Sequence, residues 1–573
     1  METRDLIRAA KGEIPADLLL TDARIVNVYT GQAAPGNIAV YGGRIVGVGD
    51  GDWPAKRTVS LRNRYAAPGF IDAHVHIESS MAGVSGFVRG VLPRGTTTVV
   101  ADPHEIANVL GMDGVAYMLA TAENQPMNIY FMLPSCVPAT AMETAGAVLD
   151  ADSLMPLLSH ERILGLGEMM NFPGVLNADD DVIKKIEAAF SHGKLVDGHA
   201  PGLSGKNLSA YLAAGISSDH ESVTAEEAFE KLSAGMFIMV REGTGAKNLS
   251  DLISVVTPYT EPFLMWCTDD RHPEDILRYG HIDSLIKKAV AAGVDAMTAI
   301  RMATINPARY FGLSRLGAIA PGKIADIVVF RDLETLAVES VYTAGQLAAE
   351  NGRMRPDVSS PAPVSCPSAM HVDAVGLDFT VPEAGEKVRV IELVPDQLVT
   401  KSKLMDAARE NGRVISDPSR DMLKLVVVER HQGTGRVGKG FVNGFGLQKG
   451  ALASSVAHDS HNIIAVGVAD ADLLAAVRAV VEMEGGLAVA SGGRIDASLA
   501  LPIAGLMVDA DFYEIRQQTD AINQAARGLG CRVHDPFMAL SFLALPVIPE
   551  LRLTDLGLFD VSAFAHVPLM ATI

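Results

Sequence analysis

The nine residues Pro68–His76 read PGFIDAHVH, and the interpretation of the rest of the chain begins from them. The mostly apolar run Gly69–Val75 predicts a buried β-strand that ends in two histidines, two positions apart. Side chains at positions i and i+2 of a strand point to the same side. His74 and His76 can therefore bind one metal ion together at the end of this strand.

Seven further apolar runs follow, and helix-patterned stretches such as Val182–His192 and Ala225–Ala234 lie between most of them. Over residues 67–312 this gives about 31 residues per strand–helix unit, close to the repeat of a barrel of usual size. The pattern predicts an α/β fold with a (β/α)8 TIM-type barrel rather than a doubly wound open sheet, because a barrel makes the strand ends converge. The seven runs are Thr96–Ala101, Ile129–Leu133, Ile163–Gly167, Leu195–Gly198, Ile216–Asp219, Met236–Val240 and Phe263–Thr268.

Short alternating strands flank this segment on both sides, in residues 1–66 and again in residues 313–352. Each group is too small to fold alone, so we expect them to form one composite small β-sandwich domain into which the barrel is inserted. Residues 353–369 contain four prolines and four serines and are expected to form a linker. Residues 370–573 are expected to form an additional C-terminal α/β domain.

Composition limits the functional classes. The chain has 573 residues and a net charge of −20, which argues against a nucleic-acid or anionic-membrane partner on electrostatic grounds. Four cysteines without a C-x-x-C pair exclude a disulfide framework and argue against a thiolate zinc site. The charged start METRDLIRAAKGE has no apolar signal region. We therefore expect a soluble, cytoplasmic protein of several domains.

Further metal-ligating side chains follow other predicted strands. Glu168 ends the fourth strand, His199 and His220 follow the fifth and sixth, and Asp269 follows the eighth. A barrel brings all these ends to one mouth. Imidazole and carboxylate ligands suit Zn, Mn or Fe better than Ca or Mg, and their number exceeds the three of a usual catalytic ion. The pattern predicts two ions bridged by Glu168.

These motifs resemble the amidohydrolase superfamily, and their detailed sequences resemble its adenine deaminase family across nearly the whole chain. The resemblance implies hydrolysis of adenine to hypoxanthine and ammonia, with two Mn(II) or Fe(II) ions; the ligand set fits Zn(II) as well. Many binuclear members carry a carbamylated lysine where this chain has Glu168, which counts against a hydantoinase or dihydroorotase. The motifs are HIESSM (76–81), DPHEIANVLG (102–111), GLGEMMNFPGV (165–175), DGHAPGLSGK (197–206), DHES (219–222), REG (241–243), CTDDRHP (267–273), APGKIADIVVF (320–330) and HDSHN (458–462).

The expected chemistry needs two proton-transfer groups. Asp269 directly follows its strand and is preferred to Asp270 as the residue that takes a proton from the attacking hydroxide and passes it to the leaving nitrogen. A second acid must protonate the ring nitrogen N1, and the spacing does not choose among its candidates. Asp102 is alternatively a metal ligand. The candidates are Glu78, Asp102, His104 and Glu105.

Other polar residues have a functional and a structural interpretation. Glu105, Arg241, Glu242 and Asp270 are candidates for substrate binding, although Arg241 and Glu242 fit a surface ion pair equally well. In the C-terminal region a cluster is expected either to hold another metal, to close the barrel mouth, or to be only a hydrogen-bonded group. Its members are Glu429, His431, His458, Asp459 and His461.

The leading hypothesis is an adenine deaminase that acts as a homodimer. The alternatives are an amidohydrolase acting on another amino-purine or a cyclic amide, and a binding protein without activity on the same scaffold.

Overall fold

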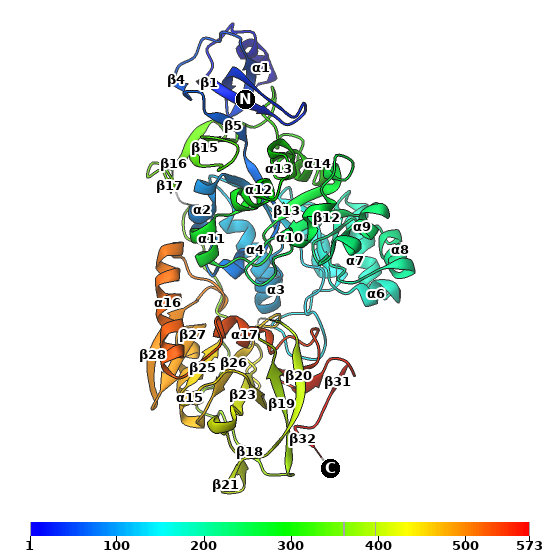
Figure 1. The fold of residues 1–573 in the computed structure, drawn as a ribbon, viewed down its shortest axis with the longest axis vertical. Helices are drawn as coiled ribbons and strands as arrows, with labels where there is room; N and C mark the ends of the chain where they lie inside the picture. The colour runs from blue at the N-terminus through cyan, green and yellow to red at the C-terminus, as the bar shows by residue number, and fades with distance from the viewer. Residues whose placement is uncertain (1, 359–360, 396, 572–573) are drawn as a thin grey trace.

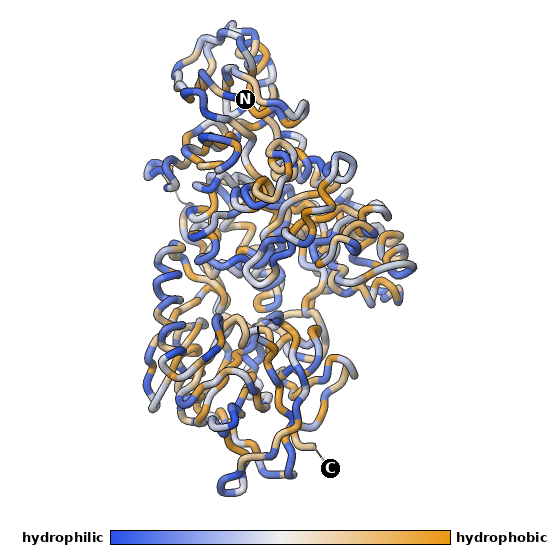
Figure 2. Tube along the Cα trace, viewed as in Figure 1, coloured by the Kyte–Doolittle hydropathy of each residue, from blue (hydrophilic) through white to orange (hydrophobic). Residues whose placement is uncertain are grey.

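The protein is described by a computed structural model that covers residues 2–358, 361–395 and 397–571. Residues 359–360 of the predicted linker lie outside the described residues. Three regions follow one another along the longest axis: a sheet near the N-terminus, a middle region of parallel strands and helices, and a C-terminal region (Figure 1). Hydrophobic and hydrophilic residues alternate along all three (Figure 2). None of the described helices is both long enough and apolar enough to cross a bilayer.

The first sheet combines strands from both sides of the middle region. Its order is β17-β16-β15-β14-β5-β1-β2-β3, with β4 beside β1. Strand β5 pairs antiparallel with β14, so that Ala67 lies opposite Val328. The chain thus enters and leaves the middle region through two neighbouring strands. Residues 353–354 of the predicted linker extend this sheet as β17. The strands are β1 (Leu18–Asn27), β2 (Gln32–Tyr41), β3 (Arg44–Gly49), β4 (Thr58–Ser60), β5 (Tyr65–Pro68), β14 (Ile327–Phe330), β15 (Val338–Thr343), β16 (Gln346–Glu350) and β17 (Arg353–Met354).

Each of the eight predicted apolar runs of the middle region contains a strand. Five strands form a parallel sheet, β10-β9-β8-β7-β6, and three form a second parallel sheet, β11-β12-β13. Backbone hydrogen bonds connect the two sheets at both edges: the Ser217 amide donates to the Val196 carbonyl (3.2 Å), and the Asp269 amide donates to the His74 carbonyl (3.0 Å). The strands are β6 (Phe70–Val75), β7 (Thr96–Ala101), β8 (Asn128–Leu133), β9 (Ile163–Met169), β10 (Leu195–Gly198), β11 (Ser218–Asp219), β12 (Phe237–Arg241) and β13 (Leu264–Cys267).

Amphipathic helices cover these strands. In α7, Val182, Ile186 and Ala189 are buried at helical spacing, and the Asp179 side chain caps the first turn. On the other side of the strands, Ile71, Val100 and Met265 belong to one buried apolar cluster. The main helices are α2 (Val84–Val91), α3 (His104–Leu110), α4 (Met112–Thr121), α5 (Ala151–Leu158), α7 (Asp180–Ser191), α8 (Gly205–Ala213), α9 (Ala225–Ser233), α11 (Pro273–Tyr279), α12 (Ile282–Ala291), α13 (Ala296–Met302) and α14 (Ile305–Tyr310).

The C-terminal region is built on a second large sheet, ordered β20-β19-β24-β23-β26-β25-β27-β28, with β32 beside β19. Helix α15 (Asp470–Glu482) buries its apolar side against this sheet. Helices α16 (Phe512–Gly528) and α17 (Pro536–Phe542) lie on the side that faces the middle region (Figure 1). The strands are β19 (Lys387–Leu393), β20 (Thr400–Asp406), β23 (Leu423–Val428), β24 (Val437–Asn443), β25 (Ala451–Ser454), β26 (Ile463–Gly467), β27 (Gly486–Ser491), β28 (Arg494–Ala500) and β32 (Met570–Ala571).

Hydrogen bonds join the C-terminal region to the segment that follows β6. The Gly83 amide donates to the Val508 carbonyl (2.9 Å), and the Val508 amide donates to the Met81 carbonyl (2.9 Å). The Thr144 hydroxyl, in the loop after β8, donates to Asp555 (2.7 Å). The C-terminal region is thereby fixed next to the ends of β6 and β8. The whole is a mixed α/β fold with flanking β-sheet regions.

Candidate metal centre

Six side chains predicted as metal ligands converge at the carboxyl ends of the parallel strands. His74 Nε2 and His76 Nε2 are 3.2 Å apart. The Asp269 Oδ1 oxygen is 3.6 Å from His74 Nε2 and 3.0 Å from His76 Nε2. His74 stacks on His220, with the ring centroids 4.1 Å apart. Five of the six side chains are buried, and His199 is partly exposed. The complete set is His74, His76, Glu168, His199, His220 and Asp269.

Glu168 lies at the middle of this set, and its two oxygens face different histidines. Oε1 is 3.3 Å from His76 Nε2 and 3.7 Å from His74 Nε2. Oε2 is 2.6 Å from His199 Nδ1 and 3.3 Å from His220 Nε2. A carboxylate whose two oxygens face two separate groups of imidazoles has the arrangement needed to bridge two cations.

The surroundings of His76 test whether these residues suit a cation. Its Nδ1 lies 2.9 Å from the Asp102 carbonyl, which accepts a hydrogen bond only if Nδ1 carries the proton. The lone pair of Nε2 then points at His74, Glu168 and Asp269. Lone pairs and carboxylate oxygens that face one another at these distances are satisfied by a cation between them, and the His and carboxylate donors fit Zn, Mn or Fe.

The electrostatics of the centre also fit bound positive charge. Burial alone would lower the pKa of His76, but Asp269 and Glu168 raise it well above the ordinary value. Burial would raise the pKa of Glu168, but His220 and His199 lower it well below the ordinary value. The carboxylates are thus ionised and draw a proton onto a neighbouring imidazole. A cation bound in the same place would replace that proton.

Asp269 is held in an unusual position. Its backbone has φ 55°, a left-handed conformation that is uncommon outside glycine. Its Oδ2 accepts a hydrogen bond from Arg241 Nη1 (2.8 Å), leaving Oδ1 toward the histidines. Arg241 also donates through Nη2 to Glu221 (2.9 Å), whose Oε1 is 3.4 Å from His220 Nε2. Arg241 therefore orients two carboxylates of the centre instead of forming a surface ion pair.

Glu221 was not among the predicted site residues. The signal that could have found it is its place directly after His220, in the motif DHES at the end of β11. Only after the fold brings Arg241, His199 and His220 around it does its position at the centre become evident.

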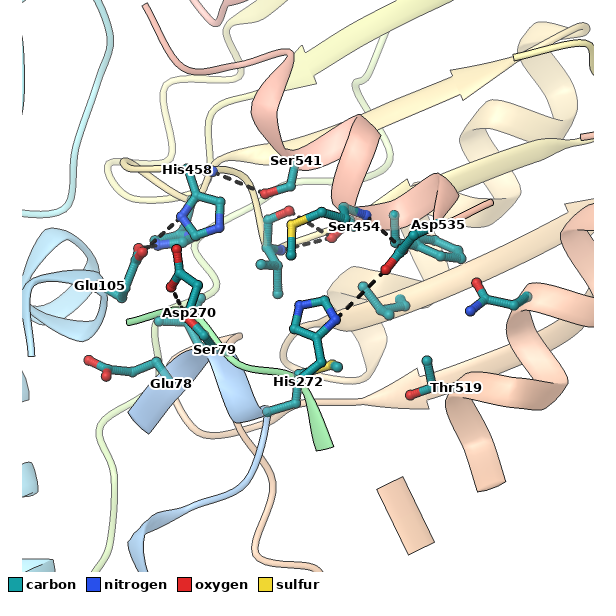
Figure 3. A pocket seen from close by; sticks show the side chains of 18 residues that line it. Glu78, Ser79, Glu105, Asp270, His272, Ser454, His458, Thr519, Asp535 and Ser541 are labelled. Carbon is teal, nitrogen blue, oxygen red and sulfur yellow. Dashed lines mark hydrogen bonds and ion pairs between the residues drawn. The ribbon is translucent and has the colours of Figure 1, made fainter. Parts of the chain in front are cut away.

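A cavity of about 690 Å³, including its open mouth, lies between residues that follow the parallel strands and the C-terminal region (Figure 3). Glu78, Glu105 and Asp270 line its wall on the side of the parallel strands. Glu78 is buried, which raises its pKa to about 7, and its Oε2 has no hydrogen-bonding partner within the described chain. The opposite wall comes from the C-terminal region. It includes Ser454, His458, His461, Asp535, Phe537 and Ser541.

Asp102 and His104, the other two candidates for acid catalysis apart from Glu78 and Glu105, lie next to Glu168. Asp102 accepts a hydrogen bond from the Glu168 amide (3.0 Å), and its Oδ1 has no partner among the described residues. His104 Nδ1 is 3.5 Å from Glu168 Oε1, and His104 Nε2 is 3.5 Å from Glu105 Oε1. Neither Asp102 nor His104 lines the cavity, and the donor atoms of His104, His76 and Glu168 are close enough together to hold a cation.

Three of the predicted site residues, Glu242, Glu429 and His431, lie apart from the centre. Glu242 forms an ion pair with Lys288 on α12 and does not line the cavity. Glu429 accepts hydrogen bonds from the Gln432 and Thr434 amides in its own loop (2.6 and 2.9 Å). His431 Nε2 lies 2.6 Å from the Ser460 carbonyl.

The other three members of the expected C-terminal cluster lie near the cavity. His458 and His461 contact Glu105. Asp459 is buried; burial and the charge of Glu105 raise its pKa to about 6. Asp459 in turn raises the pKa of Glu143, which burial has already raised. The structure thus divides the cluster into a part that reaches the cavity and a part that holds loops.

Comparison with known proteins agrees with this architecture. Residues 65–348 match the model of the amidohydrolase family, and residues 397–565 match that of the adenine deaminase C-terminal domain. A protein named adenine deaminase from Desulfatibacillum aliphaticivorans is 55% identical over 98% of this chain and 99% of its own length. Adenine deaminase 2 from Carboxydothermus hydrogenoformans is 49% identical over 99% of both chains. A protein named adenine deaminase from Methanothrix thermoacetophila is 48% identical over 99% of this chain and 100% of its own. The chain belongs to the adenine deaminase family of the amidohydrolase superfamily.

Proposed function

We propose that this protein hydrolyses adenine to hypoxanthine and ammonia. The observation that carries the proposal is the convergence of four imidazoles and two carboxylates on one point beside a cavity. Family membership over the full length supports adenine as the substrate. Adenine and water supply all the atoms of the two products, so no other reactant is needed.

The architecture supports a closed (β/α)8 barrel as the scaffold of this site. The two parallel sheets are hydrogen-bonded to each other at both edges, and the functional side chains all lie at the carboxyl ends of the strands. In this fold active sites are found at that face. The composite sandwich over residues 1–66 and 313–352 and the domain over residues 370–573 complete the proposed organisation.

The donor set supports a binuclear centre, and we propose Mn²⁺, with Fe²⁺ or Zn²⁺ as alternatives that the metal titration below distinguishes. His74, His76 and Asp269 would hold one ion, His199 and His220 the other, and Glu168 would address both. When bound, such ions lower the pKa of water and stabilise developing negative charge.

The protein side chains supply positioning and proton transfer. Asp269, whose Oδ2 is held by Arg241, directs Oδ1 toward the histidines of the centre and is placed to accept the proton of the attacking water. Glu78 lines the cavity with an unpartnered oxygen, which makes it the best placed of the four candidates to donate a proton to N1. Ammonia leaves from C6 as the nitrogen gains the proton carried by Asp269, and the hydroxyl on C6 then loses its proton, which restores the acid form of Glu78.

The test is ammonia release from adenine by metal-depleted protein titrated with Mn²⁺, Fe²⁺ or Zn²⁺. Activity is expected to rise until about two equivalents of the preferred metal are bound. A panel of amino-purines and cyclic amides, assayed at the same metal content, identifies the substrate. Greater kcat/KM for a cyclic amide than for adenine would contradict the proposal.

A further inference from the structure

A second group of histidines lies next to the candidate metal centre, and its members come from two regions of the chain. Glu105, on α3, points at His458 and His461 of the C-terminal region. All three side chains are buried, and their donor atoms are close enough together to hold a cation. Two imidazoles and one carboxylate are also a common catalytic zinc set. The cluster is therefore either a third metal site or a hydrogen-bonded unit.

The hydrogen bond made by the inner nitrogen of His461 decides between these possibilities. The Ala457 amide donates to His461 Nδ1 (3.1 Å), so Nδ1 carries a lone pair. Burial lowers the pKa of His461 to about 4, which leaves the ring neutral. A neutral ring with a lone pair on Nδ1 carries its proton on Nε2. Nε2 is the atom that contacts Glu105, and it therefore donates a hydrogen bond and has no lone pair for a metal.

The orientation of Glu105 then determines that of His458. With Oε2 bonded to His461, Oε1 lies 2.8 Å from His458 Nδ1 and forms an ion pair with it. The His458 ring also stacks on Phe542, with centroids 4.7 Å apart. His458 lines the cavity, and its second ring nitrogen has no hydrogen-bonding partner within the described part of the chain (Figure 3). That nitrogen is the free polar group of an otherwise fixed ring.

We propose that Glu105, His458 and His461 form a hydrogen-bonded unit and not a third metal site, in which His461 positions Glu105 so that His458 presents its outer nitrogen to the substrate ring. A planar nitrogen heterocycle, with ring nitrogens and N–H groups in one plane, suits such a group. The inference rests on the proposed function for the identity of that heterocycle. Because both histidines belong to the C-terminal region, this region supplies part of the binding specificity.

The test compares His461→Leu, which removes the donor, with His461→Gln, which retains an N–H group near the position of Nε2. His461→Leu is expected to raise KM for adenine by roughly 10- to 100-fold, the usual effect of losing a hydrogen bond to a charged group, with little change in kcat. His461→Gln should recover most of this loss. His458→Phe, which keeps a ring against Phe542, should raise KM as well. Exposed His566, mutated to Leu, is the control in the same region.

Metal counting provides a readout that does not depend on turnover. Wild type and all variants, reconstituted and freed of excess metal, should contain the same number of bound ions, and their melting temperatures verify folding. One ion fewer in His461→Leu than in wild type would overturn the inference, as would an unchanged KM in both His461→Leu and His458→Phe. Wild-type protein that releases no ammonia would instead refute the proposed function, while equal metal counts would still support the hydrogen-bonded unit.

Discussion

The two ends of the parallel strands carry buried acids in contrasting surroundings. At the carboxyl ends, Glu168 is enclosed by imidazoles, and nearby Asp102 and Glu78 each have an oxygen without a partner among the described residues. At the amino ends, Asp326 accepts hydrogen bonds from Asn128 Nδ2 (2.7 Å) and the Ala344 amide (2.8 Å), and its backbone carbonyl accepts one from Gly69. Unpartnered carboxylate oxygens thus lie where a ligand is expected, whereas Asp326 joins the middle region to the flanking sheet.

Buried acids therefore have different roles at the carboxyl and amino ends of the parallel strands. At the carboxyl ends burial of a charge is tolerated because a bound cation can satisfy the acids, and stability is given up for binding. At the amino ends the same fold uses a buried acid as a structural connector. Substitutions at the two ends should therefore separate activity from stability.

The largest effect is expected for Glu168→Gln. The amide keeps the shape of the side chain but loses the charge that faces both groups of histidines. Activity should fall by far more than the roughly 10- to 100-fold typical of outer partners of a metal site. Ammonia release and bound metal are measured together. Full metal content with full activity would remove Glu168 from the centre.

Removal of metal tests how far bound cations stabilise the carboxyl ends of the strands. At free metal near 100 times its dissociation constant, bound metal contributes about 2.7 kcal/mol per site to the free energy of unfolding. Chelation should lower the melting temperature of the wild type, and Mn²⁺ should restore it. In Glu168→Gln both changes should be smaller. An equal response of the two proteins would mean that the stabilising metal binds elsewhere.

The amino end is tested by Asp326→Asn and the pH dependence of stability. Burial raises the pKa of Asp326 from 3.8 to about 6, so the native state binds this proton more tightly than the unfolded state does. The contribution to stability is therefore fully present below about pH 4 and is lost as the pH rises through 6, by up to about 3 kcal/mol.

Urea unfolding at several pH values between 4 and 7 measures this effect as the difference between wild type and Asp326→Asn. The variant should gain in relative stability as the pH rises, while its kcat/KM with adenine stays close to that of the wild type. A difference that does not change with pH would show that the Asp326 carboxyl is not the group responsible.

The smallest effect is expected for Glu242→Gln. The Glu242 carboxylate pairs with Lys288, whose side chain is 43% exposed, and does not line the cavity. Glutamine keeps the shape of the buried Glu242 side chain, and Lys288 can reach water once the pair is lost. We expect kcat/KM within about threefold of wild type and only a small fall in melting temperature. A large loss of activity with normal folding would place Glu242 in the site after all.

The strands of the middle region could be predicted because apolar runs of strand length recur at barrel spacing. The ends of these runs also indicated the six candidate ligands, since each ligand lies at the end of its strand or just after it. The choice among Glu78, Asp102, His104 and Glu105 could not be made from the sequence. It depends on which carboxylate at the cavity keeps an oxygen without a partner, and the partners of Glu105 come from a region more than 300 residues away.

For the same reason the C-terminal cluster could not be divided from the sequence. The residue type alone does not distinguish His431, His458 and His461. A main-chain carbonyl holds His431 in a loop, and a main-chain amide fixes the tautomer of His461. Both partners are backbone groups, which leave no mark in the residue pattern.

The reciprocal hydrogen bonds between Val508 and the Met81–Gly83 segment have a consequence for synthesis on the ribosome. All six presumed ligands emerge within the first half of the chain, but the opposite cavity wall emerges only with its last quarter. A nascent chain can therefore assemble its cation-binding residues well before it can enclose a purine. The cavity can be complete only after the C-terminal region has been added.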